Sequence, residues 1–301
     1  MRVLVTGVGG QLGHDVINQL KAKGHTAIGT DIKDLDSVGC EYHQLDITDL
    51  TKVEALIEQL KVDAVIHCAA WTAVDAAEDE ANKDIVFSIN VTGTENIAKA
   101  CNKMNIKMMY ISTDYVFNGQ GEAPWEPDDK QYAPLNYYGK TKLLGEQCVA
   151  KLVDKFFIVR IAWVFGLNGN NFIRTMLKLG KKLPELRVVN DQIGTPTYTR
   201  DLAVLLVQMI ETQKYGYYHA TNEGGFISWY DFAKEIFRQA KIDINVIPVS
   251  SVEYGAAKAN RPFNSRLDKS KLKESGFDLL PSWEDALNRY LIEIGEINGK
   301  D

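Results

Sequence analysis

The chain has 301 residues, of which 45% are hydrophobic and 25% charged, and its net charge is -6 at pH 7. This composition is typical of a globular protein that buries a large core. The absence of a basic stripe argues against a nucleic-acid-binding protein, and no apolar run is long enough to cross a membrane. We therefore expect neither nucleic acid nor a membrane among its partners.

Four cysteines and five histidines are scattered along the chain. Because no C-x-x-C, H-x-E or H-E-x-x-H spacing occurs, the sequence predicts reduced thiols and no metal site. The first residues read directly as a strand, without a charged and apolar leader. We therefore expect a cytoplasmic protein.

The first half of the chain alternates strand-like and helix-like segments. The predicted strands are 2–7, 26–31, 41–46, 63–70, 107–113 and 156–163, and the predicted helices are 11–23, 49–60, 84–104 and 136–153. Strands that are apolar throughout are buried on both faces, as in a parallel sheet covered by helices. The pattern therefore predicts an α/β fold with a doubly wound parallel Rossmann sheet.

The second half is less regular. Helices are expected at 171–182 and 200–212, and short strands at 188–190 and 217–220. Ser228 and Ser282 each precede an acid by three residues, which is a helix-start signal. We interpret residues 1–165, with part of 195–222 returning to them, as a dinucleotide-binding domain, and residues 166–301 as mainly a smaller, substrate-binding lobe.

A glycine-rich loop, G-x-x-G-x-x-G, follows the first strand and opens the first helix. Gly7 allows a sharp turn, Gly10 lets the backbone approach a pyrophosphate, and Gly13 lets helix and strand pack closely. The helix begins at Gln11 and Leu12, and this N-terminal end of the helix faces the phosphates. The loop predicts dinucleotide binding, although glycine clusters also form ordinary turns.

Asp31 ends the second predicted strand, where a carboxylate can accept hydrogen bonds from the adenosine ribose. A carboxylate repels a 2′-phosphate, so Asp31 favours NAD over NADP, although Lys33 is close enough to soften this preference. The alternative is an acid in a surface turn.

The next two predicted strands also end in candidate cofactor contacts. Asp46 and Ile47 fall where the adenine edge would lie, although Asp46 can equally cap the helix that follows. Ala69 and Ala70 end the fourth strand, where small side chains leave room for the cofactor; ordinary strand packing is the alternative reading.

Ser112 and Thr113 end the fifth predicted strand, and Tyr138 and Lys142 lie four residues apart on the next helix, hence on one face. A free tyrosine has a pKa of about 10, and a neighbouring ammonium group favours the phenolate and lowers that value. A hydroxyl of Thr113, or of Ser112, can polarise a carbonyl group. The set predicts hydride transfer to a ketone with Tyr138 as proton donor, whereas a surface Tyr–Lys pair is the alternative.

At these positions the chain resembles the dTDP-4-dehydrorhamnose reductase family of extended short-chain dehydrogenases/reductases. The most specific matching strings are TAVD at 72–75 and DQIGTPT at 191–197. Further matches lie at 6–13, 70–78, 112–119, 134–146, 160–165, 169–172 and 261–265, so the resemblance covers nearly the whole chain.

The resemblance implies reduction of the 4-keto group of dTDP-4-dehydro-β-L-rhamnose by NADH or NADPH, which gives dTDP-L-rhamnose for polysaccharide synthesis. It also implies a role for each of the following residues: catalysis for Thr113, Tyr138 and Lys142; cofactor contact for Thr72 and Asn90; sugar contact for Tyr115 and Trp163; and diphosphate contact for Asn171 and Arg261. Core packing for Trp163 and a surface turn for Arg261 are the alternatives. The family further suggests a homodimer, in some members linked to magnesium, although no carboxylate cluster here predicts a metal.

Other functions remain open at this stage. The nearest is another nucleotide-4-ketosugar reductase or an epimerase or dehydratase of the same fold. A dehydratase favours an Asp–Glu pair after the catalytic hydroxyl, but here Tyr115 follows Asp114. An epimerase requires a further acid or base, such as a cysteine or histidine near the sugar. A different class is a regulatory subunit like the β subunit of methionine adenosyltransferase, against which the intact set of Thr113, Tyr138 and Lys142 argues.

Overall fold

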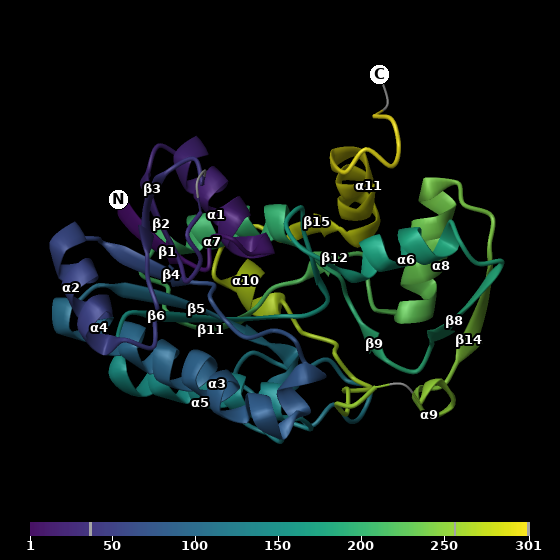
Figure 1. Ribbon diagram of the computed structural model, residues 1–301, viewed down its shortest axis with the longest axis horizontal. Helices are drawn as coiled ribbons and strands as arrows, with labels where there is room; N and C mark the ends of the chain where they lie inside the picture. Colours follow the sequence, from purple (N-terminus) through teal and green to yellow (C-terminus); the bar gives the residue numbers. More distant parts are fainter. Residues whose placement is uncertain (36–37, 256, 300–301) are drawn as a thin grey trace.

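Seven strands form one parallel sheet in the larger part of the molecule (Figure 1). The computed structural model describes residues 1–35, 38–255 and 257–299. In spatial order the strands are β11 (Gly216–His219), β6 (Phe156–Ile161), β5 (Lys107–Thr113), β4 (Ala64–His67), β1 (Arg2–Thr6), β2 (Thr26–Asp31) and β3 (Glu41–Gln44). Every neighbouring pair is parallel. The predicted doubly wound Rossmann sheet is confirmed.

Helices cover both faces of this sheet (Figure 1). One face packs on α1 (Gln11–Ala22) and α7 (Thr199–Ile210), and the other on α2 (Leu50–Leu60), α4 (Thr94–Met104) and α5 (Tyr137–Leu152). Side chains of β1 alternate between the two cores, so both faces of the strand are apolar. Burial of a large aliphatic side chain stabilises the fold by roughly 1.5–3 kcal/mol, so these two cores hold the sheet rigid beneath its loops.

The helix predicted at 84–104 is not regular along its length. It consists of α3 (Lys83–Phe87), a π-helical segment η3 (Ser88–Gly93) and α4. Asn90 lies in the wide turn, and its side chain bonds the backbone of Trp71 and the hydroxyl of Thr141. A π-helical turn inside a longer helix often lies near a functional site. Here the hydrogen bond from Trp71 to Asn90 joins this turn to the loop that follows β4.

The predicted strands 2–7, 41–46, 63–70 and 156–163 all end earlier than expected, and the last two of these early ends affect candidate site residues. The predicted strand 63–70 stops at His67, because the amide of Ala69 turns back to the side chain of Thr6 at 3.1 Å. The predicted strand 156–163 stops at Ile161, since Trp163 has a left-handed φ of 50°. Ala69, Ala70 and Trp163 therefore lie in loops beyond the strand ends.

The smaller lobe is built around α6 (Phe172–Gly180), α8 (Trp229–Ala240) and α11 (Trp283–Glu293), whose apolar faces share a third core (Figure 1). Four two-stranded pairs complete the fold: β8 (Glu185–Val189) with β14 (Asn245–Val249), β9 (Ile193–Gly194) with β13 (Ile227–Ser228), β12 (Asn222–Glu223) with β15 (Leu280–Ser282), and β7 (Val164–Phe165) with β10 (Thr197–Tyr198). Two short helices are α9 (Ser251–Tyr254) and α10 (Ser270–Glu274).

Both predicted helix starts in the lobe are confirmed. Ser228 and Asp231 form a reciprocal capping box at the start of α8, and Ser282 caps α11. The chain also returns from the lobe to the main sheet through β11, which pairs with β6. Among the described residues, no helix combines the length and apolar character needed to cross a membrane.

Candidate active site

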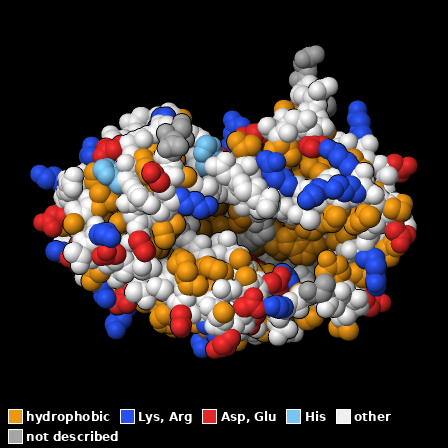
Figure 2. Space-filling view, viewed as in Figure 1, with side chains coloured by type: hydrophobic (Ala, Val, Ile, Leu, Met, Phe, Trp, Pro, Cys, Tyr) orange, Lys and Arg blue, Asp and Glu red, His pale blue; other side chains and the backbone are white. Residues whose placement is uncertain are grey.

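A cavity of about 560 Å³ opens at the carboxyl ends of the central strands and extends to the lobe. Figure 2 shows the surface hollowed between the two parts of the molecule, with hydrophobic side chains gathered in the hollow. The sequence-predicted residues that line the cavity are Gly7, Gly10, Gln11, Leu12, Asp31, Asp46, Ile47, Ala69, Ala70, Thr72, Thr113, Tyr115, Tyr138, Lys142 and Trp163. Ligands of open α/β sheets bind at this edge, where the strand order reverses between β1 and β4.

The glycine loop has the geometry that its spacing predicts. Gly7 has a φ of 71°, and a Cβ there would lie 2.7 Å from the Ala69 backbone. A Cβ on Gly13 would lie 2.4 Å from the Gly7 carbonyl oxygen. Gly10 is the N-cap of α1 and has no side chain to cap the helix, so the first amides of α1 are available to a phosphate.

Two carboxylates lie along the next strand ends of the cavity. Asp31 accepts the Gly9 amide at 3.0 Å and the Lys33 amide at 3.2 Å, so it fixes the glycine loop while it lines the cavity. Asp46 accepts the amide and the hydroxyl of Thr48, and Asp49 is the residue that caps α2. Asp46 thus supports a turn, and its side chain still lines the cavity.

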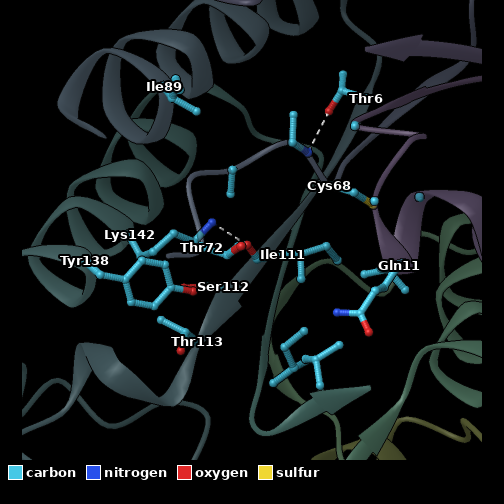
Figure 3. Close-up of a pocket in the computed structure, with 18 of the residues that line it drawn as sticks. Thr6, Gln11, Cys68, Thr72, Ile89, Ile111, Ser112, Thr113, Tyr138 and Lys142 are labelled. Atoms are coloured by element: carbon cyan, nitrogen blue, oxygen red, sulfur yellow. Dashed lines mark hydrogen bonds between the residues drawn. The ribbon is translucent and has the colours of Figure 1, made fainter. Parts of the chain in front are cut away.

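The catalytic candidates meet on the side of the cavity opposite Gln11 (Figure 3). Thr113 ends β5, and Tyr138 and Lys142 extend from the first turns of α5. Asn136 caps this helix through the Gly139 amide at 2.8 Å. A Cβ on Gly139 would lie 2.3 Å from the Tyr115 carbonyl oxygen, so glycine at this position lets α5 approach the end of β5 closely.

The pKa of Tyr138 is raised above its ordinary value of 10, chiefly by burial. A hydrogen bond with Thr113 opposes this shift, and the charge of Asp114 adds to it. Lys142 is not among the groups that shift this pKa, so the expected lowering by its ammonium group is not found. Tyr138 keeps its proton at neutral pH, which is the state that a proton donor needs.

Lys142 is buried, with 3% of its surface exposed. Its ammonium donates to the Ile111 carbonyl at 2.7 Å (Figure 3). The same group lies over the ring of Tyr110. Burial lowers the pKa of Lys142 to about 7, although the carboxylate of Glu146 opposes the shift. The hydrogen bond to Ile111, near the end of β5, thus fixes the direction of the Lys142 side chain.

Asp114 and Ser112 also line the cavity, beside Thr113. Asp114 is 2% exposed and accepts the Thr113 hydroxyl at 3.1 Å, and burial raises its pKa to about 6. The sequence shows that Asp114 directly follows Thr113, but nothing in it indicates that this acid is buried in the cavity wall.

Three predicted site residues do not line the cavity. Asn90 is 1% exposed and holds Trp71 and Thr141 behind the wall. Asn171 caps α6 and donates to Gln11, Gly166 and Tyr290, so its amide is used within the protein. Arg261 pairs with Asp75 at 2.7 Å. In this structure the three residues support the wall rather than form it.

The lobe contributes Asn170 and Trp229 to the cavity, and neither was predicted. Trp229 is the first residue of α8 and stacks on Trp163, with ring centroids 3.7 Å apart. The Ser228 helix-start signal placed Trp229 at a helix end, but nothing local in the sequence placed that end beside β6. Among the described residues, no group of three side chains suited to a metal ion is found.

Comparisons with known proteins agree with this geometry. Residues 1–295 match the family described as RmlD substrate binding domain. The Aggregatibacter actinomycetemcomitans dTDP-4-dehydrorhamnose reductase is 39% identical over 95% of this chain and 97% of its own. The Bacillus subtilis spore coat polysaccharide biosynthesis protein SpsK is 38% identical over 97% of each chain.

A solved relative has the same fold along its whole length. The crystal structure of the Bacillus anthracis dTDP-4-dehydrorhamnose reductase in complex with NADP superposes with a TM-score of 0.88. It is 41% identical, and the match covers 97% of this chain and 99% of that one. The nucleotide-binding fold, the Tyr138–Lys142 helix and these full-length matches together place the chain in the dTDP-4-dehydrorhamnose reductase family.

Proposed function

We propose that this protein is the NAD(P)H-dependent oxidoreductase that reduces the 4-keto group of dTDP-4-dehydro-β-L-rhamnose to give dTDP-L-rhamnose. The observation that carries the proposal is the position of Thr113 and Tyr138 on the wall of the same cavity as the glycine loop. A hydride donor and a proton donor can therefore reach one carbonyl group from within a single site. Relatives across the full length of the chain have this reductase name.

The wall of the cavity fits a dinucleotide. Gly7 and Gly13 let the loop pack closely on the Ala69 backbone and on α1, and the uncapped start of α1 offers amides to a pyrophosphate. Asp31 and Asp46 would face the adenosine, and Ala69, Ala70 and Thr72 the middle of the cofactor. When bound, NADH or NADPH supplies the hydride. We assign residues 1–165, with part of 195–222, to this task and 166–301 mainly to the nucleotide sugar.

The chain's own residues supply the proton. The Thr113 hydroxyl orients the carbonyl oxygen, and Tyr138 transfers its phenolic proton to that oxygen as carbon 4 receives hydride. The product is a secondary alcohol, and Tyr138 is left as a phenolate that must be reprotonated from solvent. Lys142, held by the Ile111 carbonyl, stabilises this phenolate and the ribose beside it.

An epimerase is a weaker candidate because, among the described residues, the cysteine and the histidine beside the reaction centre are poorly suited to removing a proton from the sugar. Cys68 lines the cavity, but burial raises the pKa of its thiol to about 12. His67 is enclosed between the hydroxyls of Thr6 and Thr94, and burial lowers its pKa to about 3. Neither group is set up to remove a proton from a sugar carbon at neutral pH.

The test is turnover of freshly generated dTDP-4-dehydro-L-rhamnose with NADH and with NADPH, followed by loss of absorbance of the reduced nicotinamide. We expect oxidation of the cofactor and formation of dTDP-L-rhamnose in equal amounts. A folded protein that binds NAD(P)H but reduces no keto-sugar nucleotide would support the regulatory-subunit alternative instead. Oxidation with another 4-keto sugar alone would redirect the substrate assignment.

A cytoplasmic location and a homodimer stay predictions. Reduced nicotinamide and nucleotide sugars are both cytoplasmic metabolites, which supports the first. Light scattering on the purified protein tests the second.

A further inference from the structure

The indole N–H groups of the five tryptophans divide into two kinds. Trp71, Trp125 and Trp283 donate to backbone carbonyl oxygens at 3.0–3.2 Å. Within the residues that the structure describes, Trp163 and Trp229 donate to no protein acceptor, and both line the cavity. An indole N–H that donates to no acceptor within the protein, on a residue that lines a cavity, is available to a ligand.

Trp229 is held firmly by other aromatic side chains. Its ring stacks on Trp163 with an interplanar angle of 15°, and the Phe172 ring lies 4.5 Å away, centroid to centroid. Because Trp229 is the first residue of α8, the Ser228–Asp231 capping box also fixes its backbone. A donor that is already immobile loses little conformational entropy on binding, which makes its hydrogen bond more effective.

The backbone of Trp163, the other member of this stack, is in a left-handed conformation. Its φ of 50° is unusual for a bulky residue and is a strained backbone conformation. The Thr197 amide holds it there by donating to its carbonyl at 3.1 Å, and Gly194 leaves room for the indole, because a Cβ at that position would lie 2.9 Å from Cε2. Strain of this kind persists where the surrounding structure enforces it, most often at binding sites.

The stacked pair lies beside the proposed reaction centre. Thr113 of β5 is paired in register with Ile161 of β6, and Trp163 follows two residues later. Trp229 therefore reaches the cavity next to the strand end that carries the catalytic hydroxyl. The part of a nucleotide sugar that must lie here is the hexose, whose carbonyl meets Thr113 and Tyr138.

We infer that Trp229 is a substrate-positioning residue whose indole N–H donates to a hydroxyl of the hexose, while its ring is fixed by Trp163 and Phe172. This inference rests on the proposed function, because it needs the sugar to lie at Tyr138. It assigns to the lobe a specificity contact with the sugar itself, in addition to any contact with the nucleotide.

The decisive variant is Trp229→Phe, which keeps an aromatic ring in the stack and removes the donor. The matched control is Tyr230→Phe, which removes one hydroxyl at the next position of α8, outside the cavity. Calorimetry with dTDP-L-rhamnose, dTDP and NADPH as separate probes measures binding without turnover. We expect Trp229→Phe to weaken dTDP-L-rhamnose binding about tenfold, as loss of one hydrogen bond predicts, with dTDP and NADPH unchanged.

Each other result has a definite meaning. Unchanged affinity for dTDP-L-rhamnose overturns the contact, and an equal loss for dTDP and dTDP-L-rhamnose overturns its assignment to the hexose. If the variant does not fold, wild-type protein labelled with nitrogen-15 at tryptophan replaces it. The Trp229 indole signal must then shift on addition of dTDP-L-rhamnose but not of dTDP, and a signal that does not move overturns the proposal.

Failure of the proposed function is distinguishable from failure of this inference. A wild-type protein that binds dTDP-L-rhamnose but reduces no keto sugar contradicts the reductase, while the binding comparison still decides the role of Trp229. In a working reductase, Trp229→Phe should raise KM for the keto sugar with little change in kcat, since a positioning contact present before and during reaction affects binding alone. A wild-type protein that does not bind dTDP-L-rhamnose contradicts both.

Discussion

The ammonium of Lys142 donates to the carbonyl oxygen of Ile111 at 2.7 Å and not to the phenol of Tyr138, one helical turn away. The backbone near the end of β5 therefore orients the Lys142 side chain. The same environment removes the lysine from water and lowers its pKa from an ordinary 10.5 to about 7. Two measurable properties, stability against pH and tyrosine reactivity, depend on this arrangement.

The first prediction concerns stability and pH. Between about pH 7 and pH 10.5 the unfolded chain holds the Lys142 proton and the native state has released it, so this group makes stability rise with pH across that interval. The free energy of unfolding of wild type, minus that of Lys142→Met, should rise by up to about 1.4 kcal/mol per pH unit. Urea titrations between pH 7 and pH 9 measure it, with exposed Lys140→Met as the control. A difference that is flat in pH contradicts the buried-lysine account.

The second prediction concerns the glycine loop. Gly13→Ala would place a Cβ 2.4 Å from the Gly7 carbonyl, so α1 must move away from β1. We expect NADPH affinity to fall by roughly 10²-fold, because the helix end and its amides leave the pyrophosphate position. Asn18→Ala, an exposed change on the same helix, should leave affinity within about twofold. Fluorescence titration with NADPH tests both, and wild-type affinity in Gly13→Ala would mean that this contact is not critical.

The third prediction concerns the choice of cofactor. Asp31→Asn keeps an acceptor for the Gly9 or Lys33 amide and removes the charge that repels a 2′-phosphate. We expect kcat/KM for NADPH relative to NADH to increase by about tenfold, equivalent to about 1.4 kcal/mol. The neighbouring exposed Asp34→Asn serves as the control for general charge. An unaltered ratio would show that Asp31 acts only on the loop.

The fourth prediction concerns a buried ion pair behind the site. Arg160 and Glu146 are fully buried and joined by two hydrogen bonds of 2.8–2.9 Å, and Glu146 lies one turn beyond Lys142 on α5. Glu146→Gln leaves a guanidinium without its counter-charge and should destabilise the fold by about 3–5 kcal/mol. Adding Arg160→Met should recover part of that loss. As a control, Arg238→Ala breaks the surface ion pair with Glu235 and should lower the free energy of unfolding by under about 1 kcal/mol. If the losses from Glu146→Gln and Arg160→Met simply add in the double variant, the two residues are not coupled and the prediction is contradicted.

The sequence predicts the nucleotide-binding half of the fold well because its signals are local. The glycine loop, the apolar strands and the Tyr138–Lys142 spacing each depend on neighbouring residues. The early end of β6 is not local: it follows from the left-handed backbone of Trp163, which Gly194 and Thr197 stabilise from another part of the chain. Neither the end of β6 nor the π-helical turn at Asn90 has a signature in the residues that form it.

The lobe shows where sequence reasoning fails for the site. The family resemblance implies a diphosphate contact for Asn171, yet its side chain caps α6 and joins Gln11 to Tyr290. Trp229 was visible as the first residue of a helix, but its place beside Trp163 depends on how the lobe packs on β6. The strand β14 was missed because it pairs only with β8, a partner about sixty residues earlier.

The most direct test of the account is single-turnover reduction of dTDP-4-dehydro-L-rhamnose by wild type and by Tyr138→Phe, with NADPH already bound. Tyr137→Phe is the matched control, because its hydroxyl lies outside the cavity and donates to the Lys83 carbonyl. The account predicts that Tyr138→Phe binds NADPH normally and slows reduction by roughly 10²-fold or more, while Tyr137→Phe reacts at nearly the wild-type rate. A Tyr138→Phe enzyme that reduces the sugar as fast as wild type would contradict proton transfer from this residue.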